Sequence, residues 1–196
     1  MIIGITGGTG CGKTTALEVI SQLGGLVLDC DAIYHDLLKT NRDLLGQIAA
    51  RFPGTVEEGQ LLRKKLGQLV FSDPQALSDL NGITHRFVCQ AVKEALKDHP
   101  PLAAIDAIAL VESGLSRLCD VTVAVTAPVE VRVARLMVRD NIPESYARAR
   151  IAAQPSEDFF RANCDYVLEN NGTPQEFRKK CLAFFSGLDI MKPYVS

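Results

Sequence analysis

Short apolar runs alternate along the chain with longer segments whose apolar residues recur every three or four positions. The short runs are typical of buried strands, and the longer segments are typical of helices that pack one face on a sheet. The runs that predict strands cover residues 2–6, 26–28, 102–110, 121–125 and 166–168. This alternation predicts an α/β fold in which a five-stranded parallel sheet is flanked by helices.

The segment between the second and third predicted strands shows helical patterns only. Helices are expected over residues 32–39, 42–52, 61–71 and 74–99. Asp73 followed by Pro74 is typical of a helix start, because aspartate caps the first turn and proline fits the first helical position. We therefore expect a helical insertion in an otherwise regular strand and helix sequence.

A glycine-rich sequence, Gly-Gly-Thr-Gly-Cys-Gly-Lys-Thr, follows the first strand at residues 7–14 and precedes a helix expected over residues 13–23. A strand, such a loop and a helix in that order make a P-loop, which binds the phosphates of a nucleoside triphosphate. Glycines lack a Cβ, so the backbone N–H groups can turn toward phosphate oxygens. Lys13 is expected to contact the β- and γ-phosphates, and the Thr14 hydroxyl to bind the Mg²⁺ that bridges them.

Composition limits the other functions. The 196 residues suffice for one α/β domain with lobes. A net charge of −2 gives no general attraction to nucleic acid or anionic membrane, so neither is expected as a partner. Six cysteines without a C-x-x-C pair favour reduced thiols. Because no apolar run approaches a membrane span and no signal peptide precedes the first strand, we expect a soluble, cytoplasmic protein.

Six of the twelve arginines fall within residues 132–161, a segment without lysine. Helices are expected there over residues 128–140 and 144–154, and Arg132, Arg135 and Arg139 share one helical face. A planar guanidinium can bind two phosphate oxygens at once. We interpret this segment as a lid that closes on the phosphates; the alternative is a solvated face of ordinary surface charges.

Phosphoryl transfer needs a carboxylate close to the accepting hydroxyl, and often another near Mg²⁺. Asp31 follows the second strand, at the sheet edge where ligands bind in such folds, and its structural alternative is a helix N-cap. Asp106 lies in an apolar run, where burying a carboxylate without a cation is costly, so it is a candidate Mg²⁺ ligand. Glu112, just past that run, is a weaker third candidate.

Several motifs together resemble those of the dephospho-CoA kinases, a family of P-loop enzymes in the superfamily of the nucleoside-monophosphate kinases. The resemblance covers nearly the whole chain, and it rests on the order and spacing of the motifs. The matching segments are residues 3–15 (the P-loop), 29–31 (D-C-D), 109–112 (A-L-V-E), 135–140 (R-L-M-V-R-D), 150–154 (R-I-A-A-Q) and 164–172 (C-D-Y-V-L-E-N-N-G).

The resemblance implies phosphorylation of the ribose 3′-hydroxyl of dephospho-CoA by ATP and Mg²⁺, giving CoA and ADP in the last step of CoA biosynthesis. It implies that Asp31 orients or deprotonates this hydroxyl, and that Lys13 and Arg139 act on the phosphates. The residues expected to bind ATP are Gly8, Thr9, Gly10, Cys11, Gly12, Lys13, Thr14, Thr15, Arg139, Asn170, Asn171 and Gly172, the last three beside the adenine.

The acceptor side follows from the same resemblance. The residues expected to bind dephospho-CoA are Asp31, His85, Arg86 and Glu112, and those expected at Mg²⁺ are Thr14 and Asp106. The expected parts are a nucleotide-binding core of residues 1–31, 101–127 and 164–196, a CoA-binding insertion of residues 32–100, and a lid of residues 128–163. A monomer or a weak homo-oligomer is expected.

Two other functions stay open. A P-loop indicates the phosphoryl donor and not the acceptor, so another small-molecule kinase of the nucleotide, shikimate or gluconate type is the first alternative. A nucleotide-dependent switch is the second. Residues 43–46 match its D-x-x-G motif, but they lie in the helical insertion, and the chain has no N-K-x-D motif.

Overall fold

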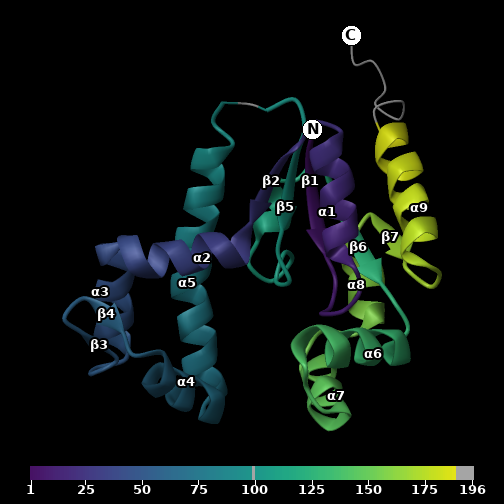
Figure 1. The fold of residues 1–196 in the computed structure, drawn as a ribbon. Coiled ribbons are helices and arrows are strands. Elements are labelled where there is room, and N and C mark those ends of the chain that lie inside the picture. The colour runs from purple at the N-terminus through teal and green to yellow at the C-terminus, as the bar shows by residue number, and fades with distance from the viewer. Residues whose placement is uncertain (99, 189–196) are drawn as a thin grey trace.

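Five parallel strands form the centre of the molecule (Figure 1), and the predicted α/β fold is confirmed. The computed structural model describes residues 1–98 and 100–188. The strands lie side by side in the order β2-β5-β1-β6-β7. Their bounds are β1 (Ile2–Thr6), β2 (Leu26–Asp29), β5 (Ala103–Asp106), β6 (Val121–Thr126) and β7 (Tyr166–Glu169).

Helices cover both faces of the sheet, which is why the strands read as nearly continuous apolar runs. On one face, α1 (Lys13–Gln22) and α9 (Pro174–Gly187) pack against strand residues that include Ile3 and Ile5. On the other face, α5 (Pro74–Ala95) packs Val88 and Val92 against residues of β2 and β5. The central strand β1 is thereby fixed, and the loop that follows it has a rigid base.

The segment between β2 and β5 is largely helical, as predicted, but it also contains a short antiparallel hairpin. Its helices are α2 (Cys30–Thr40), α3 (Arg42–Arg51), α4 (Arg63–Ser72) and α5, and its strands are β3 (Val56–Glu57) and β4 (Gln60–Leu61). Glu58 and Gly59 both have positive φ, as a tight hairpin turn requires. The prediction of helix from Leu61 was therefore wrong, because strands of two residues leave no alternation to detect.

Two further predicted bounds were wrong. Helix α5 ends at Ala95, and its predicted end, His99, lies outside the described residues. The strand predicted over residues 102–110 ends at Asp106. Beyond it the chain turns across the end of the sheet, where the Ile108 carbonyl accepts a hydrogen bond from the Thr6 hydroxyl. Leu110, in this turn, is fully buried. The apolar sequence therefore extends beyond the end of the strand, which is why the predicted strand was too long.

After β6 the chain forms α6 (Val129–Asp140) and α7 (Glu144–Ala152), close to the helices predicted there. They pack on each other through a small apolar cluster that is separate from the sheet core. Helices α8 (Glu157–Asn163) and α9 were not predicted, although Ser156 and Thr173 cap them as helix-start residues do. Among the described helices none is long and apolar enough to cross a bilayer.

Candidate active site

The loop between β1 and α1 has the backbone of a phosphate-binding loop. Gly7, Gly10 and Gly12 have φ of 133°, 79° and 98°, values that side chains disfavour. A Cβ on Gly7 would overlap the Val125 carbonyl of β6, so the close approach of loop and sheet also requires glycine there. The Lys13 Nζ donates to the Gly7 carbonyl across the loop at 3.0 Å, and α1 begins at Lys13.

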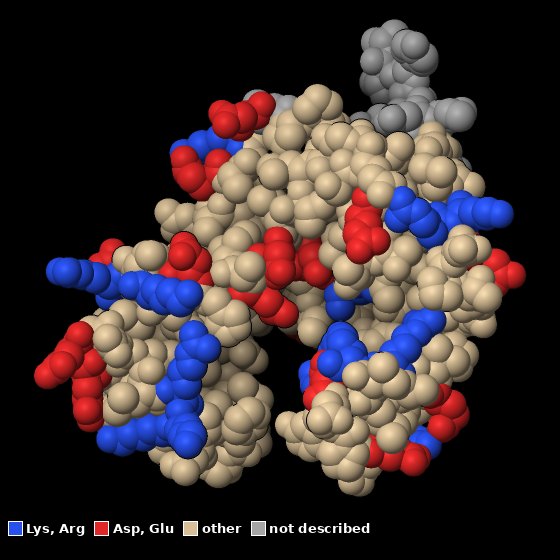
Figure 2. Space-filling model, viewed as in Figure 1, with Lys and Arg blue, Asp and Glu red and all other residues tan. Residues whose placement is uncertain are grey.

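A cavity of about 800 Å³, here called the loop cavity, opens over this loop at the carboxyl ends of the strands. Ligands bind at this edge in open α/β sheets. The structure brings together here nine of the residues predicted for the site: Gly8, Thr9, Gly10, Gly12, Lys13, Thr14, Asp31, Asp106 and Arg139. Arg135 and Arg150 also line the cavity, from α6 and α7. Figure 2 shows a deep notch in the surface on the side of these helices, with acidic side chains above it.

A smaller space of about 220 Å³, the adjoining hollow, lies between α2, α5 and the turn after β5. It is lined mainly by apolar residues, together with Tyr34, Thr84 and His85. Asp31 lines both the loop cavity and the adjoining hollow. The exposed carboxylate of Asp31 therefore stands at the junction of a phosphate-binding cavity and a second, largely apolar space.

Three carboxylates lie near one another, because the charges of Asp29 and Asp31 both act on Asp106, as does that of Lys13. Asp29 and Asp106 are paired residues on neighbouring strands β2 and β5, and Asp31 is in the first turn of α2. The helix N-cap considered for Asp31 is wrong: the Asp29 carboxylate caps α2, accepting from the N–H groups of Asp31 at 2.9 Å and Ala32 at 3.0 Å. The Asp31 carboxylate is thus left available for a ligand.

Asp106 has an unusual environment. Its Oδ1 is the one buried side-chain oxygen or nitrogen without a hydrogen-bond partner in the described part of the chain. Burial raises the pKa of Asp106 to about 6, against the opposing charge of Lys13. A buried carboxylate of this kind fits a cation contact. Mg²⁺ takes only one or two protein oxygens, so Asp106 and the Thr14 hydroxyl suit it, and no denser metal-binding cluster occurs in residues 1–98 and 100–188.

Four of the six lid arginines form two pairs that differ in what they contact. Arg139 and Arg150 line the loop cavity and both bind Asp140: Arg139 Nε and Nη2 lie 2.7 and 3.0 Å from its oxygens, and Arg150 Nη1 lies at 2.6 Å. These ion pairs are more than a third exposed on the arginine side, so a bound phosphate can compete for them. The alternative of a solvated face therefore stays open for Arg139, whose ion pair with Asp140 is exposed.

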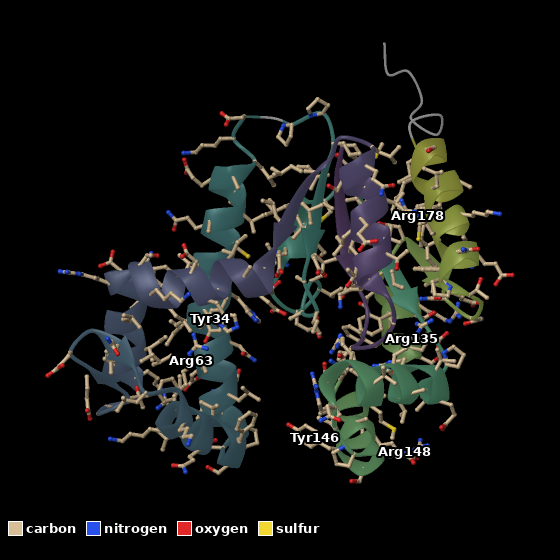
Figure 3. All side chains as sticks on the ribbon, viewed as in Figure 1. Tyr34, Arg63, Arg135, Tyr146, Arg148 and Arg178 are labelled. Atoms are coloured by element: carbon tan, nitrogen blue, oxygen red, sulfur yellow. The ribbon has the colours of Figure 1, made fainter. Side chains whose placement is uncertain are left out.

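The other pair, Arg132 and Arg135, faces the loop itself. Arg132 Nε donates to the Thr9 carbonyl at 2.9 Å, and Arg135 Nη1 donates to the Gly10 carbonyl at 3.1 Å. Arg135 lies between α6 and the start of α1 (Figure 3). The amide side chains of Gln154 and Asn170 complete these contacts, and the four residues are here called the loop clamp.

Some predicted site residues lie elsewhere. Cys11 is buried behind the loop, and burial raises the pKa of its thiol. Arg86 binds Gln47 and lines a separate surface hollow between α3 and α5, so the structure does not bring it together with His85. Glu112 is exposed and near enough to His85 to oppose the lowering of the His85 pKa by burial. Four others do not line the loop cavity: Thr15, Asn170, Asn171 and Gly172.

Comparisons with known proteins agree with this geometry. The family model of dephospho-CoA kinase matches residues 1–176. The dephospho-CoA kinase of Thermobifida fusca (strain YX) is 35% identical over 178 residues, which cover 89% of each chain. The chain belongs to the dephospho-CoA kinase family. A solved dephospho-CoA kinase from Campylobacter jejuni, 25% identical, superimposes with a TM-score of 0.68 and covers 95% of this chain and 96% of that one.

A more distant solved structure shares only the fold. Shikimate kinase from Acinetobacter baumannii is 17% identical, with a TM-score of 0.54 and coverage of 97% of this chain and 95% of that one. In the chain described here, the D-x-x-G motif of a switch protein was matched by residues 43–46. Residues 43–46 lie in α3, and they do not line the loop cavity.

The sequence did not reveal the contacts that two side-chain amides make with the loop. Gln154 was noted as the end of the motif at residues 150–154, and Asn170 as a neighbour of adenine. Asn170 is 4% exposed, beneath the loop, where its Nδ2 donates to the Cys11 carbonyl at 2.8 Å. No local pattern signals these contacts, because their partners lie 145 and 159 residues away along the chain.

Proposed function

We propose that the protein transfers the γ-phosphoryl group of ATP to the ribose 3′-hydroxyl of dephospho-CoA, giving CoA and ADP. Family membership supports the reaction class. The structural observation that supports this reaction at a named residue is the position of Asp31, which lines both the loop cavity and the adjoining hollow. A donor in the cavity and an acceptor in the hollow would meet at this carboxylate.

The donor is held by main-chain and cationic groups. The N–H groups at the start of α1 favour anions, and Lys13 lies beside them as a compact positive charge. Its bond to the Gly7 carbonyl keeps the ammonium at the loop. Arg139 and Arg150 would leave Asp140 for phosphate oxygens when α6 and α7 close over the nucleotide. These cations stabilise the charge that spreads over the transferred group.

The acceptor hydroxyl is positioned by Asp31. No N–H group from its own helix start occupies this carboxylate, because Asp29 caps α2 instead. Asp31 is therefore free to accept the hydrogen bond of the 3′-hydroxyl and to take its proton as the bond to phosphorus forms. His85 lines the hollow further from the loop cavity and would contact the nucleoside or the arm of the acceptor.

Thr14 and Asp106 would hold Mg²⁺, in keeping with the exposed hydroxyl of the first and the unpartnered buried oxygen of the second. A bound Mg²⁺ would supply positive charge that offsets the negative charge of the phosphates. We also propose the three parts expected from the sequence: a nucleotide-binding core, an acceptor-binding insertion of residues 32–100 and a lid of residues 128–163. The cytoplasmic location and the monomeric or weakly oligomeric state stay predictions.

The reaction is tested by coupled ADP release with ATP, Mg²⁺ and dephospho-CoA, beside AMP, CMP, shikimate and gluconate as acceptors. We expect release with dephospho-CoA alone, and a product heavier by about 80 Da, the mass of one phosphoryl group. Release with another acceptor only would keep the P-loop kinase and reject the substrate. Nucleotide binding without release for any acceptor would reject the kinase in favour of a switch.

A further inference from the structure

Gln154 and Arg132 form a closed ring of hydrogen bonds with the backbone N–H and carbonyl groups of Thr9. The Thr9 N–H donates to Gln154 Oε1 at 2.8 Å, and the Thr9 carbonyl accepts from Arg132 Nε at 2.9 Å. Arg132 Nη2 also donates to Gln154 Oε1 at 3.0 Å, which closes the ring. Both polar groups of one loop residue are thus held from the lid, Arg132 by α6 and Gln154 just after α7.

The rest of the clamp holds the next loop carbonyls. Arg135 Nη1 lies 3.1 Å from the Gly10 oxygen and 3.3 Å from the Cys11 oxygen, and Asn170 Nδ2 donates to the same Cys11 oxygen at 2.8 Å. Arg135 Nη2 and Asn170 Oδ1, 3.2 Å apart, join the two side chains. Three successive loop carbonyls are therefore bound on the side of α6 and β7.

The loop glycines make room for this clamp. A Cβ on Gly8 would overlap the Arg132 guanidinium, and a Cβ on Gly12 would overlap the Asn170 amide. A side chain at either glycine would thus have to displace one of the clamp side chains. The clamp side chains pack closely against the loop backbone. Such close packing allows the clamp to hold the loop in one shape.

Arg132 also differs from the arginines that face the loop cavity. Its guanidinium donates to Thr9 and Gln154, it does not line the loop cavity, and with Gly8 and Cys11 it lines a small space behind the loop. Arg139 and Arg150 line the cavity and bind the Asp140 carboxylate. The lid arginines therefore include one that holds the loop and two that are placed for phosphate.

We propose that Gln154 and Arg132 are positioning residues that hold the Thr9 peptide with its N–H turned toward the lid, which orients the remaining loop N–H groups toward the phosphates. The loop shape is thereby tied to α6 and α7, the helices that carry Arg139 and Arg150. This inference rests on the proposed function for its nucleotide ligand, although the ring itself exists without one. Its role is in binding the α- and β-phosphates, and not in the chemical step.

Two variants of Gln154 isolate the ring. Gln154→Leu removes the acceptor and leaves the Thr9 N–H and the Arg132 Nη2 without their partner, whereas Gln154→Glu keeps an oxygen at the same place. The first measurement, without nucleotide, is hydrogen exchange at the Thr9 amide. We expect exchange to speed up about tenfold or more in Gln154→Leu and to stay near the wild-type rate in Gln154→Glu.

The second measurement is calorimetric titration with ADP and Mg²⁺, because ADP contacts the loop and lacks the γ-phosphate. We expect about tenfold weaker ADP binding in Gln154→Leu, with recovery in Gln154→Glu. Arg132→Gln should behave like Gln154→Leu. Its matched control is Arg148→Gln, a lid arginine that binds Glu130 and Glu144 at the α7 end, away from the loop (Figure 3).

The outcomes separate the two proposals. Unchanged Thr9 exchange in Gln154→Leu would overturn the positioning role, whatever the protein binds. Faster exchange with unaltered ADP affinity, and loss confined to turnover, would also overturn it. Wild-type protein that binds no ADP would reject the proposed function, while the exchange measurement still tests the ring. A Gln154→Leu protein that fails to fold leaves Arg132→Gln to decide by the same two measurements.

Discussion

Individual side chains at this site are distinguished by what binds them. Asp29 and Asp31 are two residues apart, yet the first is used by the α2 N-cap and the second is left for a ligand. The sequence offered both roles for Asp31, and only the placement of the Asp29 carboxylate over the α2 N–H groups decides between them. Residue type and spacing were sufficient to find the two aspartates, but not to decide which one caps the helix and which one is left for a ligand.

We expect Asp31→Ala to lower kcat by about two to four orders of magnitude, the usual contribution of a general base. The dissociation constant of ATP should change little, since Lys13 and the loop hold the phosphates. Steady-state kinetics with dephospho-CoA and a separate ATP titration measure the two effects. Turnover close to wild type would remove Asp31 from the mechanism.

A second prediction concerns the buried charge of Asp106. Its pKa is raised from 3.8 to about 6 by burial, so the folded protein binds a proton there more tightly than the unfolded chain does. This favours the folded state fully below about pH 4, and the contribution is lost as the pH rises through about 6. We expect Asp106→Asn to be more stable than wild type at pH 8, by up to about 3 kcal/mol, and similar at pH 4.

Urea unfolding without nucleotide at pH 4, 6 and 8 measures this difference. The matched control is Asp36→Asn, the same substitution at an aspartate that is exposed on α2. A stability difference for Asp106→Asn that is the same at all three pH values would contradict the assigned cause.

Helix starts and strand ends set the positions of the functional groups at the scale of elements. β1 ends where the P-loop begins, and β2 and β5 end at the three carboxylates. Helix α2 carries Asp31 in its first turn because its N-terminus is capped one residue before the helix begins. The direction of this one helix therefore fixes where the acceptor-facing carboxylate stands.

We expect Asp29→Ala to lower the free energy of unfolding by about 1 kcal/mol, because two N–H groups of α2 lose their cap. Asp31→Ala is the matched variant in the same turn, and its stability should stay within about 0.5 kcal/mol of wild type, as is usual for surface substitutions. Denaturant unfolding of both variants measures the contrast. Equal losses for the two would mean that the cap is shared.

The whole molecule places two helical segments on either side of the site. Figure 1 shows the α2 to α5 segment on one side and α6 and α7 on the other. The α2 to α5 segment lines the adjoining hollow, and α6 and α7 line the loop cavity. Asp31 and Ile108 are common to both spaces, so the two ligands would meet at one edge and otherwise contact different elements. Donor and acceptor binding should therefore be largely separable.

We expect ADP with Mg²⁺ and dephospho-CoA each to raise the Tm. At about 100 times Kd, binding adds about 2.7 kcal/mol, or about 5 to 10 °C for a chain of this size. Lys13→Ala should lose the ADP shift and keep the dephospho-CoA shift, because Lys13 lines only the loop cavity. Differential scanning calorimetry measures both shifts, and loss of both in Lys13→Ala would show that the two spaces act as one site.

The sequence by itself determined the local features of this protein. Each strand of the central sheet is a short apolar run, and the P-loop is a short segment rich in glycine. The family motifs lie in a fixed order along the chain. Such features depend on neighbours along the chain, so periodicity and spacing are sufficient to find them. The hairpin at residues 56–61 was not predicted, because strands of two residues are too short to show an alternation of apolar and polar residues.

Only the tertiary structure decided which side chain meets which group. It gave the α2 cap to Asp29, left Asp106 Oδ1 unpartnered, and brought Gln154 and Asn170 to a loop more than a hundred residues away. It also separated Arg132, on the loop, from Arg139, on the cavity. Helical spacing places both arginines on one face, but the packing of α6 against the loop determines which carbonyl or cavity each of them reaches.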